Sequence, residues 1–233
     1  MKKSKRYQKI AVLVEKNKLY SVTEAVSLVK KTATAKFDET INISIKLGVD
    51  TKQPDQLVRT SVLLPHGTGK TPKVLVFAKG EKEKEATESG ADFVGAEELY
   101  EKISKGWYDF DIAVSTPDLM REVGKLGKIL GPKGLMPNPK SGTVTFDIKK
   151  VVKDFKSGKI EYKADASGVI NTRIGKASMS EKQFMDNIYT LMDSIIRTKP
   201  ASVKGVYIEA ITIFSTMGPG IKIETKEFLK TQK

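Results

Sequence analysis

The middle of this 233-residue chain alternates short apolar runs with amphipathic stretches, and this alternation restricts the possible folds more than any other feature. The apolar runs cover residues 74–78, 91–94 and 112–115. Stretches with helical spacing lie between them, at residues 81–89 and 96–105. Strands that are apolar on both faces and separated by helices indicate parallel βαβ units, sandwiched between helix layers. The segment therefore predicts a three-layer α/β fold.

The part of the chain before this segment follows a different pattern. Ser21 and Glu24 match a capping box, which predicts a helix over residues 22–31. Apolar and polar residues then alternate along residues 41–49, as in a strand with one buried face. Residues 58–64 are expected to be the partner of that strand.

Strand-like alternation returns after residue 160, followed by an expected helix over 181–197 and a strand over 206–214. Neither terminal part carries many elements alone, so they are expected to form one discontinuous α+β domain. The predicted domains are residues 1–67 together with 159–233, and an inserted α/β domain over 68–158 joined by a double hinge.

Residues 131–140 contain three prolines and two glycines, which predicts a shaped loop with neither helix nor strand. The loop carries Lys133 and Lys140, and its surroundings are basic. Residues 120–160 hold ten lysines and arginines against Glu122, Asp147 and Asp154, which is +7 of the formal net charge of +13. This charge favours a polyanionic partner.

The composition leaves little material for catalysis. The chain has no cysteine and a single histidine, His66, so disulfides, cysteine-ligated zinc and cysteine nucleophiles are excluded. We expect no catalytic residue, no metal and no cofactor. The basic N-terminus lacks the apolar core of a secretory signal, and no apolar stretch approaches the roughly 20 residues of a membrane span. With a pI near 9.6, a cytoplasmic nucleic-acid-binding protein without a membrane partner is expected.

Residues 67–71 (Gly-Thr-Gly-Lys-Thr) resemble part of a phosphate-binding loop, but the first glycine of that motif is replaced by Leu64 and a strand follows. A hinge loop is therefore favoured. The alternative is a nucleotide-dependent enzyme that uses the α/β domain, with Lys70 and Lys133 as phosphate ligands. A double-stranded DNA-binding protein is a third possibility.

Asp109 and Asp111 flank Phe110 and would point to one side of a strand, within reach of a metal. No third ligand joins them, so a turn that enters a strand is favoured. His66 beside Gly67 is interpreted as a loop residue and not as a catalytic base.

Two further segments suit RNA. Phe37 stands at a polar junction before a strand, where an aromatic ring beside a cation could stack on a base, although spacing alone favours a core role. Residues 215–220 contain two glycines and a proline, which is typical of a simple β-turn. The same residues also leave an open backbone surface for a sugar-phosphate chain.

Six motifs, in this order, closely resemble the ribosomal protein L-one family of large-subunit stalk proteins: Lys36-Phe37-Asp38-Glu39-Thr40, Leu64-Pro65-His66-Gly67, Gly90-Ala91-Asp92, residues 131–140, Gly175-Lys176-Ala177-Ser178 and Thr216-Met217-Gly218-Pro219. The resemblance spans nearly the whole chain. It implies a discontinuous rRNA-binding domain and an inserted Rossmann-like α/β domain. It also implies that the protein is not an enzyme and is a monomer when free of the ribosome.

The resemblance also implies site residues and partners. The family's RNA-contact cluster maps onto Lys36, Phe37, Glu39, Thr40, Thr216, Met217 and Gly218, with Lys176 and Ser178 as additional contacts, and Met179 departs from the phenylalanine of many relatives. We expect Lys133 and Lys140 to be secondary RNA contacts. The partners implied are 23S rRNA at the mobile stalk, the exit-site tRNA whose release the family assists, and the protein's own operon mRNA. The protein would act as a repressor of that mRNA.

Overall fold

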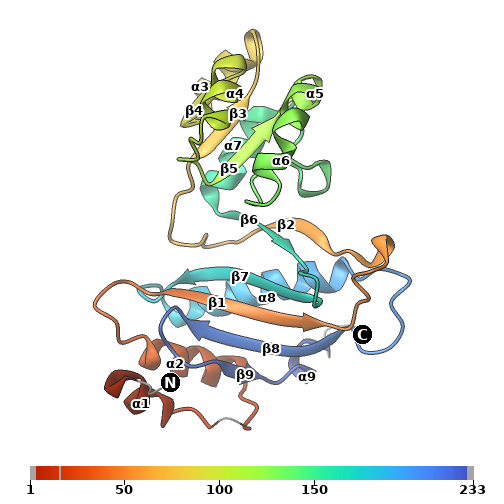
Figure 1. The fold of residues 1–233 in the computed structure, drawn as a ribbon. Coiled ribbons are helices and arrows are strands. Elements are labelled where there is room, and N and C mark those ends of the chain that lie inside the picture. The colour runs from red at the N-terminus through yellow and green to blue at the C-terminus, as the bar shows by residue number, and fades with distance from the viewer. Residues whose placement is uncertain (1–3, 16, 230–233) are drawn as a thin grey trace. The chain divides into compact units, whose positions relative to one another are not determined.

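The protein folds into two compact units, seen in a computed structural model that describes residues 4–15 and 17–229 (Figure 1). The first unit comprises the described residues up to Gly69 and those from Tyr162 onward. The second unit is the continuous segment Lys70–Glu161.

A four-stranded antiparallel sheet forms the centre of the first unit, in the order β7-β1-β8-β9. Its strands are β1 (Thr40–Leu47), β7 (Val169–Lys176), β8 (Ile208–Ser215) and β9 (Ile221–Ile223). The central strand β1 therefore has both neighbours in the C-terminal part of the chain.

The predicted pairing of residues 58–64 with the first strand is wrong. These residues form β2 (Arg59–Leu63), which pairs with β6 (Lys159–Lys163) in a separate two-stranded sheet. Both edges of β1 are already occupied by strands rich in isoleucine. Alternation identifies a strand with one buried face, but it does not identify the neighbour of that strand.

Two amphipathic helices cover one face of the four-stranded sheet, α2 (Val22–Thr32) and α8 (Glu181–Arg197). Both begin with a capping box, at Ser21 and at Ser180. Their apolar sides bury alternate residues of β1, whereas the intervening residues of β1 remain partly exposed on the opposite face. The first unit is completed by the short helices α1 (Lys5–Ala11) and α9 (Lys226–Leu229) and the 3-10 helix Pro54–Gln56.

The second unit is the expected three-layer α/β fold. Its parallel sheet has the order β4-β3-β5, with strands β3 (Val74–Phe77), β4 (Phe93–Gly95) and β5 (Ile112–Ser115). One hydrophobic core lies on each face, because Leu75 and Phe77 join one cluster while Val74 and Val76 join the other. The helices are α3 (Glu81–Glu88), α4 (Glu97–Ser104), α5 (Met120–Val123), α6 (Gly127–Leu130) and α7 (Ile148–Ser157), with 3-10 helices Pro117–Leu119, Gly124–Leu126 and Pro139–Ser141.

The proline- and glycine-rich segment 131–140 is irregular along most of its length, but its end differs from the prediction. Pro139 and Lys140 begin a 3-10 helix, because the Asn138 side chain accepts the backbone N–H of Lys140 and caps the turn. Leu135 and Met136 pack against the core of the second unit. Within the part of the chain that the structure describes, no helix is long and apolar enough to cross a bilayer.

Candidate nucleic-acid interface

Three strand ends of the first unit meet at one end of the four-stranded sheet. The first residue of β1, Thr40, pairs with the last residue of β7, Lys176, and the next residue, Ile41, pairs with the last residue of β8, Ser215. The segments that enter or leave these strands are 36–40, 176–178 and 216–218. The structure thus brings together the nine residues that the resemblance assigned to RNA contact.

Glu39 ties two of these segments together through a buried carboxylate. Its Oε1 accepts the backbone N–H of Ala35 at 2.8 Å and its Oε2 accepts that of Met217 at 2.9 Å. Burial acts to raise the pKa of Glu39, but these two hydrogen bonds, the Ser215 hydroxyl and the Arg6 guanidinium together hold the pKa below its usual value. Glu39 is therefore a charged frame residue beneath the surface and offers no exposed carboxylate to RNA.

Thr216 locks the same turn to the start of β1. Its backbone N–H and its hydroxyl both donate to the carbonyl oxygen of Thr40, at 3.0 and 3.1 Å. The hydroxyl oxygen in turn accepts the backbone N–H of Thr40 at 3.2 Å. One side chain therefore fixes the position of the 216–218 turn relative to β1.

The third segment is held by Asp38, which the sequence analysis did not assign a role. Ser178 donates to its carboxylate through the backbone N–H at 3.1 Å and through the hydroxyl at 2.9 Å. The Lys176 ammonium donates to the Asp38 carbonyl oxygen at 3.2 Å. Met179, the departure from the family pattern, accepts the Lys176 N–H on its sulfur, and this sulfur would lie 2.7 Å from a Cβ added at Gly175.

Arg6 is a second residue that sequence reasoning missed. Its guanidinium donates to the carbonyl oxygen of Met217 at 2.9 Å and to the hydroxyl of Thr34 at 3.1 Å. Arg6 lies among other basic residues of the N-terminus, and nothing in the sequence sets it apart from them. Its role follows only from its contact with Met217, which is more than 200 residues away in the chain. Gly218 is required for space, because a Cβ there would lie 2.4 Å from the Ser215 hydroxyl oxygen.

The surface above this frame carries exposed apolar groups. The Phe37 side chain is 55% exposed and that of Met217 is 49% exposed, so the core role that spacing favoured for Phe37 is wrong. Lys36 is exposed beside Phe37. An exposed aromatic ring, a thioether and a cation on a rigid backbone suit base stacking and phosphate contact.

The other residues considered in the sequence, two lysines, two aspartates and one histidine, lie in the second unit or contact other side chains. Lys133 lies over the Tyr108 ring, 4.1 Å from its centroid. Lys70 forms an ion pair with Asp111 at 2.7 Å, and Lys73 forms one with Asp109 at the same distance. Both carboxylates therefore form ion pairs with lysines. Within residues 4–15 and 17–229, no cluster of three or more possible metal ligands occurs.

In the first unit, His66 lies in a loop, and its Nε2 is 3.0 Å from Asp186 Oδ2.

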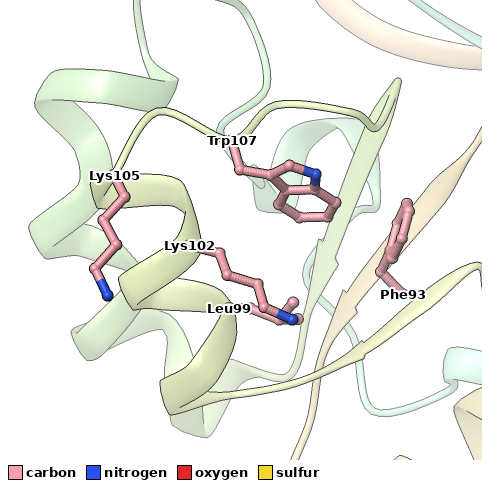
Figure 2. A pocket seen from close by; sticks show the side chains of 5 residues that line it. All are labelled: Phe93, Leu99, Lys102, Lys105 and Trp107. Atoms are coloured by element: carbon pink, nitrogen blue, oxygen red, sulfur yellow. The ribbon is translucent and has the colours of Figure 1, made fainter.

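A hollow of about 460 Å³ occurs in the second unit, lined by Phe93, Leu99, Lys102, Lys105 and Trp107. Figure 2 shows the Trp107 ring facing that of Phe93, and the two rings meet edge to face with centroids 4.7 Å apart. Neither lysine expected to bind a nucleotide phosphate lines this hollow.

The fold and the motifs agree with a comparison against known protein families. The model of the ribosomal protein L1p/L10e family matches residues 29–219. The match includes the nine interface residues named from the sequence and the whole second unit, and the terminal parts of the chain, with Arg6, lie outside it. This protein therefore belongs to the ribosomal protein L1p/L10e family.

Proposed function

We propose that this protein binds 23S rRNA at the mobile stalk of the large ribosomal subunit through Lys36, Phe37, Thr40, Lys176, Ser178 and the 216–218 turn. Family membership already makes the chain a structural, rRNA-binding protein of the ribosome. The proposal adds which rRNA is bound and which surface binds it. The observation that carries it is the convergence of three segments at one end of the sheet, with Phe37 and Met217 exposed above a hydrogen-bonded frame.

Rigidity of this frame favours specific binding. The buried Glu39 carboxylate, the Thr216 hydroxyl and the Asp38 carboxylate fix the backbone of all three segments before any ligand arrives. A preformed surface loses little conformational entropy on binding, so more of the contact energy remains as affinity.

Further roles follow from the same proposal. We include release of deacylated tRNA from the exit site and repression of the protein's own mRNA, since an mRNA fold that imitates the rRNA site would meet the same surface. We also propose that the two units are the family's domains and move about a double hinge. Two glycines with positive φ at the first crossing, Gly67 (61°) and Gly69 (71°), support such a hinge.

Substitution of Thr216 tests the proposal. Thr216→Val removes the hydroxyl and leaves the Thr40 N–H without its acceptor, so the turn shifts and the affinity for 23S rRNA falls by about tenfold or more. Met217→Asp places a negative charge on the exposed part of the same turn and is expected to weaken binding further. The dissociation constant for a 23S rRNA transcript is measured by filter binding at fixed salt, with 16S rRNA as competitor.

Thr216→Ser is the matched control, because serine keeps the hydroxyl and differs by one methyl group. It is expected to bind like the wild type. Equal affinity of Thr216→Val, Met217→Asp and wild type for 23S rRNA would contradict the proposed surface. An ATP or NAD titration that released heat would instead favour the nucleotide-dependent enzyme.

A further inference from the structure

The face of the four-stranded sheet opposite α2 and α8 is polar, cationic and open. β1 contributes Thr40, Asn42, Ser44 and Lys46 to this face, all partly exposed, because their neighbours Ile41, Ile43, Ile45 and Leu47 point into the core. The strand register then fixes which residues of β7, β8 and β9 lie on the same side. Figure 1 shows the sheet from the side on which β1 and β8 lie in front of α8.

Two rows of paired residues cross this open face. Asn42 pairs with Arg173 on one side and with Phe214 on the other. Ser44 pairs with Asn171 and with Thr212, and Thr212 pairs with Lys222 of β9. Beyond the first row, Thr40 pairs with Lys176, which is the end of the sheet where the candidate interface lies. The open face is therefore continuous with the candidate interface.

The paired positions of this face are cationic, and the exposed Glu209 lies outside them, in the bulge at the start of β8. The paired positions carry four cations, Lys46, Arg173, Lys176 and Lys222, and no carboxylate. In the described part of the chain, no hydrogen bond or ion pair engages the side chains of Arg173 and Lys222, and both residues are exposed. Two exposed cations without an ion-pair partner on a strand surface attract a polyanion, and they favour a nucleic-acid strand over an acidic protein.

Phe214 is the one aromatic residue among these paired positions. It is partly exposed and lies beside Asn42, with Thr212 two residues before it on the same face. An aromatic ring in the centre of a polar β-sheet surface is the arrangement by which single-stranded RNA bases are stacked, while neighbouring amides bond their edges. A double helix would offer no base face to this ring.

We propose that the open sheet face is a second RNA-binding surface, on which Phe214 stacks an unpaired base of the rRNA while Arg173 and Lys222 contact the flanking phosphates. The proposal rests on the proposed 23S rRNA binding and extends it along the sheet by two rows of residues. Asn42 and Asn171 supply the amide groups that hydrogen-bond the stacked base or its ribose.

Directed cleavage locates the RNA relative to the two faces of the sheet. Because the chain has no cysteine, Ser44→Cys gives a single attachment site for an iron chelate in the middle of the open face. Asp193→Cys, exposed on α8, which covers the opposite face, is the matched control. With full-length protein and a 23S rRNA transcript, hydroxyl radicals from position 44 are expected to cut an unpaired RNA segment that the control leaves intact.

Binding measurements test the two named contacts. Phe214→Leu keeps apolar bulk but removes the stacking ring, and it is expected to raise the dissociation constant about tenfold. Arg173→Gln is expected to weaken binding several-fold and to lower the salt dependence by roughly the slope of one bound phosphate. Arg197→Gln, on α8, is the control for loss of an exposed arginine and should bind like the wild type.

The outcomes separate the two proposals. Cleavage from position 44, together with weaker binding by Phe214→Leu and Arg173→Gln, supports the second surface. If Thr216→Val loses affinity while both sheet variants bind like the wild type and position 44 gives no cleavage, the second surface is overturned and the proposed function stands. If the wild-type protein does not prefer 23S over 16S rRNA, both are overturned.

Discussion

A single buried carboxylate joins the two segments that form most of the candidate interface. Glu39 is 1% exposed, yet it is ionised because it accepts two backbone N–H groups and has the Ser215 hydroxyl and the Arg6 guanidinium nearby. A buried charge is tolerated only when such partners replace its water. The residue was expected to touch RNA, but its burial assigns it to the support of the exposed Met217 and Phe37.

Replacing Glu39 tests this supporting role through pH. Glu39→Gln turns one oxygen into an amide that cannot accept an N–H, so the free energy of unfolding at pH 7 is expected to fall by about 1–3 kcal/mol. The folded-state pKa lies below the usual 4.5, so the contribution of the carboxylate is complete above about pH 4.5 and is lost as the pH falls through the folded pKa. Urea denaturation at a series of pH values checks this.

The difference in unfolding free energy between wild type and Glu39→Gln should shrink on acidification. Glu209→Gln, at an exposed position of β8, is the control and should change the stability little at any pH. A difference that stayed constant down to pH 3 would show that the charge of Glu39 is not what stabilises the turn.

At the scale of elements, the sequence predicted the two long helices of the first unit correctly, but it did not predict which strands pair with β1. The helices α2 and α8 were predictable because a capping box and an apolar stripe lie within one stretch of sequence. The neighbours of β1 were not predictable, because alternation is the same whichever strand lies alongside. Arg6 and Asp38 were missed for the same reason: their roles depend on partners that are distant in the sequence.

Asn187 is the clearest element-scale example, a fully buried amide on the apolar side of α8. Its Nδ2 donates to the carbonyl oxygens of Gly67 and Ile174, both at 2.9 Å, and its Oδ1 accepts the His66 N–H. The helical spacing predicted only apolar core residues on this side. The amide instead joins the helix to β7 and to the end of the first chain crossing.

Asn187→Leu keeps the approximate volume and leaves three backbone groups without this partner. The expected loss in free energy of unfolding is about 2–4 kcal/mol, measured by urea denaturation at pH 7. Lys182→Leu, at an exposed position of the same helix, is the control and should stay within about 0.5 kcal/mol of the wild type. If both variants have the stability of the wild type, the three hydrogen bonds do not hold α8 in place.

For the whole molecule, each unit has a hydrophobic core of its own, which the change in sequence pattern after residue 69 had indicated. The three-layer α/β fold was predictable from alternating strands and helices, and the family motifs named the residues that meet at one end of the larger sheet. The open, cationic face of the larger sheet was not, because it exists only once three distant strands are aligned.

The separate cores allow the second unit to be removed. Deleting residues 72–156 and closing the gap with a short glycine–serine linker should leave the preference for 23S over 16S rRNA intact, because the interface lies in the first unit. The salt dependence of binding should flatten by roughly one unit of slope for each phosphate that the shortened protein no longer binds. The dissociation constant is measured between 50 and 200 mM salt, and a slope identical to that of the full chain would contradict an electrostatic role for the second unit.

The order of strands in the larger sheet also constrains how the protein emerges from a translating ribosome. β1 is made early, but it pairs only with β7 and β8, which begin at Val169 and Ile208. The second unit is synthesised in full between these events and can fold first. The candidate interface, which needs the turn after Ser215, is therefore completed only when nearly the whole chain has been made.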